Sequence, residues 1–187
     1  MSILADHQIY QLCQPHASVH GPLVDPFDEE RVQPASIDLT LGNEFITFEG
    51  VKLHNDVIDL ANPPRPIGNH SVIGDDEFIR LNPLEFILGV TRERINCPPN
   101  VAAKLDGKSS LARFGLLIHV TGGFVDPGFR GPLTLEIFNV FPIPIILRPG
   151  LPFCQVGFQR LYAPAARPYS GRYQDAEGVE GSKYDGR

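Results

Sequence analysis

Residues 107–139 contain most of the side chains in this sequence that could do chemistry. Two cations and two hydroxyls follow a glycine in the run GKSSLARFG, namely Lys108, Ser109, Ser110 and Arg113. Hydroxyls, cations and backbone N–H groups at a glycine turn bind phosphate, and we therefore predict an anion site here. The same run also fits a solvated turn in which Ser109 or Ser110 caps a short helix, and the spacing alone does not separate the two interpretations.

The next candidates flank a pair of glycines. His119 lies in the apolar run LLIHV, which predicts a strand, and a histidine there is either a hydrogen-bonded core residue or a catalyst. Gly122 and Gly123 let the main chain approach a flat ligand closely, because glycine has no Cβ atom. Main-chain N–H and C=O groups after Thr121 could then read a base, although an ordinary hairpin turn has the same pattern.

Glu136 is the most informative single residue. It lies between Leu135 and Ile137 in the apolar run PLTLEIFNV. A buried carboxylate is costly unless it is paired or kept neutral, and such residues favour functional sites. The alternative places Glu136 on the polar face of an alternating strand. Asp126 and Arg130 in VDPGFRG fit either the site or a turn that carries a salt bridge between them.

Composition excludes several classes of protein. A net charge of −6 argues against a general nucleic-acid binder, and no apolar run approaches the roughly 20 residues of a membrane span. The N-terminal residues lack a secretory signal, which predicts a cytoplasmic protein. The three cysteines form no CxxC, and HExxH is absent, so we predict buried free thiols and no zinc site.

The 18 prolines and 18 glycines cut the chain into short segments that suit strands and turns. We expect one domain over residues 1–163 and a flexible polar tail over 164–187 that contributes nothing to the core. Residues 6–13 predict a helix capped by Asp6, and residues 15–34 an irregular connection. The strands are expected at 36–41, 44–48, 77–81, 85–95, 101–105, 132–140, 141–147 at an edge, and 153–163 with a bulge near Gly157. This spacing favours an all-β sandwich, jelly roll or barrel.

The run GKSSLARFGLLIHVTGGFVDPGFRGPLTLEIFN closely resembles the dCTP deaminases of the dUTPase-like superfamily. The resemblance extends to DPFDEERVQPASIDLTLG, LNPLEFILGVTRERI, ILRPG and the tail motif GSKY, and it covers nearly the whole chain except residues 43–76. It implies a distorted jelly roll of the dUTPase-like β-clip type, with a short N-terminal helix and a C-terminal lid. It also implies a homotrimer with active sites between subunits, and nucleotide ligands (dCTP, dUTP or dTTP) that carry Mg²⁺.

The resemblance assigns roles to individual positions. Glu136 matches the general acid/base of the family, and Ser109 and Arg113 match the catalytic residues beside it. The positions that match substrate-binding residues are Lys108 and Ser110 for the phosphates, His119, Val120, Thr121, Gly122 and Gly123 for the pyrimidine, Asp126 near the sugar, and Lys183 and Tyr184 in the lid.

The residues and the resemblance agree on a mechanism. Deamination of cytosine needs a water driven onto C4, a proton for the ring nitrogen and a proton for the departing ammonia. Many nucleobase deaminases use zinc-bound hydroxide, but this sequence shows no zinc ligand set, and we expect Glu136 to shuttle the proton. Mg²⁺ is expected on the triphosphate and needs no protein cage.

Three functions follow from the sequence. The first is deamination of dCTP to dUTP, and its alternative is a bifunctional enzyme that continues to dUMP and diphosphate. A plain dUTPase is less favoured, because that branch typically has an apolar residue where Glu136 stands. A nucleotide-binding trimer without catalysis is the third.

Overall fold

The computed structural model describes residues 2–17, 19, 21–51, 57–64 and 67–186. Its helices are α1 (Asp6–Leu12), the 3₁₀ turn η1 (Glu29–Arg31) and α2 (Ser109–Ala112). Its strands are β1 (Ser2–Ile3), β2 (Val24–Asp25), β3 (Val32–Gln33), β4 (Ser36–Thr40), β5 (Glu44–Thr47), β6 (Asn69–Val72), β7 (Ile79–Leu81), β8 (Phe86–Asn96), β9 (Val101–Gly107), β10 (Leu116–Leu117), β11 (Phe124–Val125), β12 (Arg130–Asn139), β13 (Ile145–Leu147) and β14 (Pro152–Arg160). None of the helices in this described part has the length and apolar character needed to cross a membrane.

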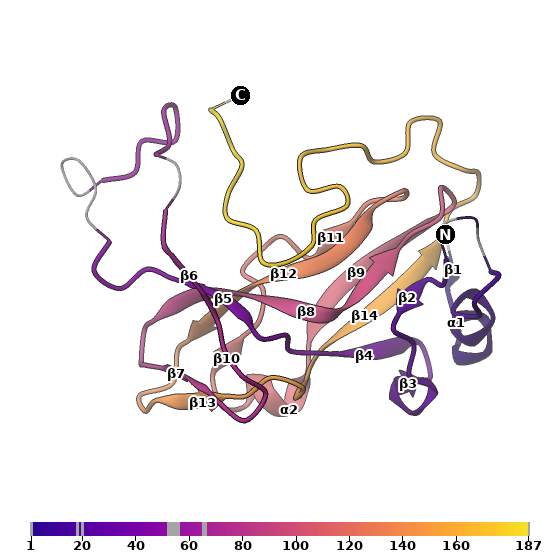
Figure 1. Cartoon of the computed structure of the whole chain (residues 1–187). Coiled ribbons are helices and arrows are strands. Elements are labelled where there is room, and N and C mark those ends of the chain that lie inside the picture. The colour runs from indigo at the N-terminus through magenta and orange to yellow at the C-terminus, as the bar shows by residue number, and fades with distance from the viewer. Residues whose placement is uncertain (1, 18, 20, 52–56, 65–66, 187) are drawn as a thin grey trace.

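Two six-stranded antiparallel sheets make up most of the structure (Figure 1). The first sheet has the order β11-β9-β14-β4-β3, with β1 paired to β14. The second has the order β10-β12-β8-β5-β6, with β2 paired to β8, while β7 and β13 form a separate pair. This arrangement confirms the all-β prediction.

Both sheets contribute to one apolar core because their strands alternate. On β12, Leu135 and Ile137 are fully buried, while Thr134, Glu136 and Phe138 point to the other face and are half-buried. The core-facing residues of the two sheets form one hydrophobic cluster. The strands that carry the candidate site therefore have one apolar face fixed in the core and one face free for chemistry.

Three local predictions from the sequence are wrong in detail. Helix α1 is capped by Ala5 instead of Asp6, and the amide oxygen of Gln8 accepts the Ala5 N–H at 3.1 Å. The bulge of β14 lies between Pro152 and Cys154, where the pairing with β4 shifts, and not near Gly157. The connection at 15–34 contains β2, η1 and β3.

The tail was expected to be flexible and to contribute no side chain to a core, and the structure differs from this expectation. Residues 161–186 contain no helix or strand, yet they return over the outer face of the second sheet (yellow in Figure 1). Val179 is only 8% exposed because it packs against Ile46, Leu88 and Val90 in a second small cluster. The tail therefore contributes one buried apolar side chain to a small cluster on the second sheet.

The three cysteines are free and buried, as predicted from their number and spacing. Burial raises the pKa of the Cys13 thiol to about 11 and the pKa of the Cys97 thiol to about 12. The pKa of Cys154 is also raised, first by burial and then by the carboxylates of Glu93 and Asp38. Buried neutral thiols are poor nucleophiles.

We therefore expect a thiol reagent at pH 8 to leave all three cysteines of the folded protein unmodified while it labels all three in guanidinium. Unfolding lets these thiols ionise near their ordinary pKa of 9.0, whereas the folded values lie higher. The free energy of unfolding should therefore fall as pH rises above 9. Stoichiometric labelling of the native protein at pH 8 would contradict the burial of these groups.

Candidate active site

Glu136 is held by backbone N–H groups. Its Oε2 accepts the N–H of Val120 at 2.8 Å and that of Thr121 at 3.4 Å. Glu136 lies opposite Leu88 in the β12–β8 pair, and its side chain therefore points to the outer face of the second sheet. The carboxylate is half-buried and not in the core, so the strand alternation is the better of the two sequence interpretations. Oε1 makes no hydrogen bond to the described residues and can meet a ligand.

The turn at 119–123 connects β10 of the second sheet to β11 of the first. Gly123 must be glycine, because a Cβ atom there would lie 2.7 Å from the carbonyl oxygen of Leu105. A Cβ atom on Gly122 would lie 3.2 Å from Oε1 of Glu136. Gly122 thus lets the main chain pass close to the Glu136 carboxylate, and Gly123 lets it pass close to Leu105 of β9. The close approach of a flat ligand to this turn stays a prediction.

His119 belongs to this turn and not to a strand, because β10 ends at Leu117. Its ring lies under Gly123, where a Cβ atom would approach Cε1 to 3.2 Å. Nε2 is 4.0 Å from Oδ1 of Asp106, which is too long for a hydrogen bond, and the buried Nδ1 has no partner among the described residues. His119 is therefore a half-buried polar residue in the turn that connects the two sheets.

The 107–113 turn follows β9 and contains helix α2. Its N-cap is Lys108, with no side-chain cap, which corrects the expectation that Ser109 or Ser110 caps it. Ser109, Ser110 and Arg113 are exposed, and Lys108 pairs with the carboxylate of Asp38. Within the described residues no hydrogen bond or ion pair joins this turn to Glu136.

Asp126 lies in an open cleft on the first sheet. The cleft has a volume of about 910 Å³ and is lined by Phe124, Asp126, Arg167 and Tyr169, among others. The salt bridge predicted between Asp126 and Arg130 is absent, because Arg130 pairs with Asp175 of the tail. Arg167 and Tyr169, the tail residues that line this cleft, were not predicted from the sequence.

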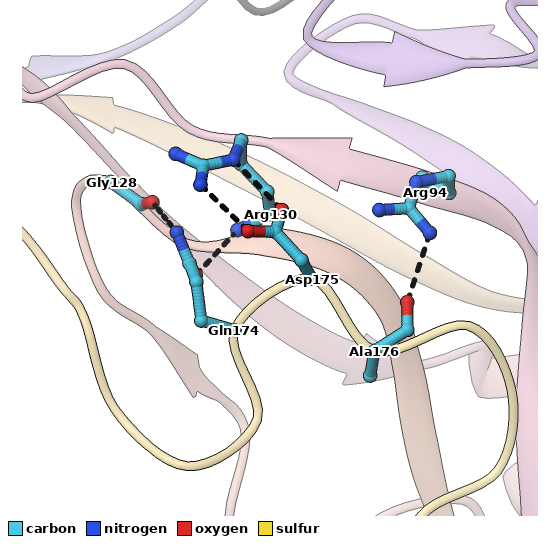
Figure 2. A network of polar contacts seen from close by, with 6 residues as sticks. All are labelled: Arg94, Gly128, Arg130, Gln174, Asp175 and Ala176. Atoms are coloured by element: carbon cyan, nitrogen blue, oxygen red, sulfur yellow. Dashed lines mark hydrogen bonds and ion pairs between the residues drawn. The ribbon is translucent and has the colours of Figure 1, made fainter.

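The tail is attached near the start of β12 by a set of contacts that we call the clasp (Figure 2). The clasp joins Gln174, Asp175 and Ala176 of the tail to Arg94, Gly128 and Arg130. Arg130 forms a two-pronged pair with Asp175, at 2.9 Å from Nε to Oδ1 and 2.7 Å from Nη2 to Oδ2. Gln174 accepts the Arg130 N–H at 3.1 Å and donates to the carbonyl oxygen of Gly128 at 2.9 Å. Arg94 of β8 donates to the carbonyl oxygen of Ala176 at 2.9 Å. These contacts fix the base of the tail.

Beyond the clasp, the tail reaches the face that carries Glu136. The Glu180 N–H donates to Oγ1 of Thr134 at 3.1 Å, and Thr134 shares the outer face of β12 with Glu136. Lys183 contacts the tail itself, through Glu180 at 3.0 Å and the carbonyl oxygen of Arg172 at 3.1 Å. Tyr184 is 42% exposed. The structure thus brings the tail to the sheet face that carries Glu136, whereas Lys183 and Tyr184 form hydrogen bonds with other tail residues.

Two site residues were missed by sequence reasoning. Asp38 on β4 and Asp106 on β9 flank β14 in the first sheet, and they lie beside Lys108 and His119 respectively. Asp38 lies on the polar side of the alternating SIDLTL run, which is the only signal it offers. Among the described residues, no group of three His, Cys, Asp or Glu side chains is placed to share a metal ion.

Comparison with known proteins finds relatives along nearly the whole chain. A family model described as dCTP deaminase-like matches residues 3–161. The chain is 46% identical over 164 residues to a Beutenbergia cavernae protein named "dCTP deaminase, dUMP-forming", covering 88% of this chain and 81% of the relative. A Methanopyrus kandleri protein of the same name is 42% identical over 187 residues, covering 98% and 96%. A Rhodospirillum rubrum protein named "dCTP deaminase" is 39% identical over 164 residues, covering 81% and 83%.

One solved structure supports the fold. The 2′-deoxycytidine 5′-triphosphate deaminase from Agrobacterium tumefaciens matches with a TM-score of 0.63 at 22% identity, over 84% of this chain. The match spans 47% of that longer chain, about half its length. At this identity the likeness shows the fold alone, and it confirms the predicted jelly-roll-like architecture.

If the Arg130–Asp175 pair holds the tail, a substitution that weakens this pair should release the tail more often. Asp175 has a positive φ of 56°, a conformation that asparagine tolerates, so Asp175→Asn removes the charge without backbone strain. Because exposed pairs are worth up to about 1 kcal/mol, we expect cleavage after Tyr173 by chymotrypsin to become roughly threefold to fivefold faster.

A matched control is Asp28→Asn, which breaks the exposed pair of Asp28 with Arg31 in η1 and should leave tail cleavage unchanged. Equal cleavage rates of the wild type and Asp175→Asn would show that the clasp does not hold the tail.

Proposed function

The chain belongs to the dCTP deaminase-like family, and from this membership we propose that it deaminates dCTP and hydrolyses the resulting dUTP to dUMP and diphosphate. The observation that carries the proposal is the Glu136 carboxylate, oriented by two backbone N–H groups on an open face. The relatives named dUMP-forming favour this bifunctional reaction over the first interpretation of the sequence, which stopped at dUTP.

In the proposed mechanism Glu136 moves protons. With Oε2 fixed by the turn, Oε1 takes a proton from a water that attacks C4 of the cytosine. The proton passes to N3, which leaves a tetrahedral C4 that carries both a hydroxyl and the amine. Glu136 then moves the hydroxyl proton to the amine, the C4–N bond breaks, ammonia leaves and the C4 carbonyl of uracil forms. A carboxylate whose direction is set by main-chain donors suits this work, because it keeps its position when its protonation state changes.

The turn beside Glu136 is the proposed pyrimidine site. Val120, Thr121, Gly122 and Gly123 offer main-chain groups, and His119 forms the wall behind them. Close passage of the main chain leaves room for a flat ring against it. In the same proposal Asp126, exposed at the cleft, contacts the sugar.

The proposed phosphate ligands lie on the 107–113 turn and in the tail. Ser109, Ser110 and Arg113 are exposed and can donate to phosphate oxygens, and Ser109 and Arg113 also orient the attacking water. Lys183 and Tyr184 would close over the phosphates after the tail rearranges. Mg²⁺ would be carried by the phosphate oxygens.

We further propose that the site is shared between copies of this chain in a homotrimer. Glu136 and the 107–113 turn make no contact with each other within the described chain, although the mechanism needs both at one nucleotide. A second copy that presents its own 107–113 turn to Glu136 would complete the site.

The reaction is tested by incubating the protein with Mg²⁺ and dCTP and resolving the products by chromatography. We expect ammonia, dUMP and diphosphate. Ammonia with dUTP alone would support the monofunctional alternative, cleavage of dUTP with intact dCTP a plain dUTPase, and binding without turnover a non-catalytic trimer.

The role of Glu136 is tested by Glu136→Gln, which keeps the shape and loses the proton shuttle. We expect kcat for deamination to fall by at least about 100-fold. The control is Glu77→Gln, because Glu77 also accepts a backbone N–H, from Gly74 at 2.6 Å, on an exposed turn. A Glu136→Gln protein with full deamination would refute the mechanism.

The shared site is tested by mixing two inactive variants, Glu136→Gln and Arg113→Ala, co-expressed with different tags. If each site takes one residue from each of two neighbouring copies, random mixing should restore about a quarter of the wild-type activity. Mixed oligomers as inactive as either parent would show that each site is built within one chain.

A further inference from the structure

Lys108 is turned toward the first sheet. Its ammonium pairs with Oδ2 of Asp38, a residue of β4 that is only 8% exposed. The side chain of Lys108 itself is 24% exposed. A pair this far from solvent holds its two side chains in a more definite direction than a surface pair does. Lys108 is thus already engaged by a protein anion.

A second contact ties the same turn to the first sheet. Nε2 of Gln155 donates to the carbonyl oxygen of Gly107 in a long hydrogen bond of 3.4 Å. Gln155 lies opposite Asp38 in the β14–β4 pair, and opposite Asp106 in the β14–β9 pair. The two residues that precede Ser109 are therefore held by two adjacent strands.

The carboxylate of Asp38 depends on this arrangement. Its Oδ1 is buried and has no hydrogen-bond partner among the described residues, and Lys108 is therefore the group that compensates its charge. Removing one partner of a buried pair leaves the other uncompensated, which disfavours the conformation that buried it. The position of the 107–113 turn is thus coupled to the negative charge of the Asp38 carboxylate on β4.

We propose that Asp38 and Lys108 act as one positioning pair that fixes the 107–113 turn at the phosphates. The ammonium of Lys108 stays with Asp38, and the phosphates are met by the exposed groups of the turn, Ser109, Ser110 and Arg113. The nature of the ligand rests on the function proposed above. Neither member of the pair touches the reacting atoms.

This role differs from that of a direct phosphate ligand in a measurable way. If Lys108 bound phosphate, Lys108→Met would weaken triphosphate binding, whereas Asp38→Asn would free the cation and strengthen it. A positioning pair predicts the same loss from either change, because both release the same turn. The double variant should then be no worse than the poorer single variant.

The experiment compares Asp38→Asn, Lys108→Met and the double variant with the wild type. It measures kcat and KM for dCTP with Mg²⁺, the affinity for inorganic triphosphate by calorimetry, and hydrogen exchange of the amides at 107–113. Asp38→Glu, which keeps the charge, is the rescue variant. Asp28→Asn is the matched control, since it breaks an exposed Asp–Arg pair at 2.8 Å in η1.

We expect each single variant and the double variant to lose about tenfold in kcat/KM, the effect of one charged hydrogen bond, and to agree within about threefold. Amide exchange should rise at 107–113, triphosphate affinity should fall in all three, and Asp38→Glu should recover most of the loss. If Lys108→Met proves unstable because it strands the carboxylate, the double variant, which removes both charges, carries the comparison.

Tighter triphosphate binding by Asp38→Asn, or additive losses in the double variant, would overturn the proposal. Unchanged kcat/KM in folded Asp38→Asn, with only a lower melting temperature, would also overturn it. Absence of dCTP turnover by the wild type would refute the proposed function alone, because triphosphate binding and amide exchange still report on the turn.

Discussion

The structure around the candidate site depends on one interaction, the acceptance of backbone N–H groups by the Glu136 carboxylate. The Val120 and Thr121 amides point at one oxygen of a side chain that extends from β12. The pairing of β12 with β8 sets the position of that side chain, and Gly122, which follows Thr121, lets the main chain come close to the carboxylate. Because donors and acceptor come from the fold itself, the carboxylate is oriented without a dedicated side-chain partner.

The two parts of the proposed site lie apart within one chain because they belong to different sheets. Glu136, Thr134 and the Val179 contact occupy the outer face of the second sheet. The 107–113 turn instead follows β9 and is tied to the first sheet through Asp38 and Gln155. A single chain therefore places its tail on the sheet face that carries its own Glu136, while Ser109, Ser110 and Arg113, the proposed phosphate ligands, are exposed. In the proposed trimer, a neighbouring copy would bring its 107–113 turn to this carboxylate.

Much of this arrangement could be predicted from the sequence, because alternation reports on local solvent exposure. The 132–140 and 153–163 runs gave the right strands, and Glu136 the right face under one of the two interpretations. The predictions of the helix caps and of the β14 bulge were wrong, because the position of each depends on one or two residues and is decided by tertiary contacts. His119 was predicted in a strand but lies in a turn, because β10 ends at Leu117, where the chain passes from the second sheet to the first.

The pairing of charges could not be predicted, since sequence separation hides it. Lys108 and Asp38 are 70 residues apart, and Arg130 and Asp175 are 45 apart. In the sequence Lys108 is one cation of an anion-binding run, and Arg130 has Asp126 as its nearest acid. In the fold, each cation binds an acid brought to it by strand pairing or by the returning tail. A motif therefore identifies which groups could meet a phosphate, but the long-range partners decide which of them are available to do so.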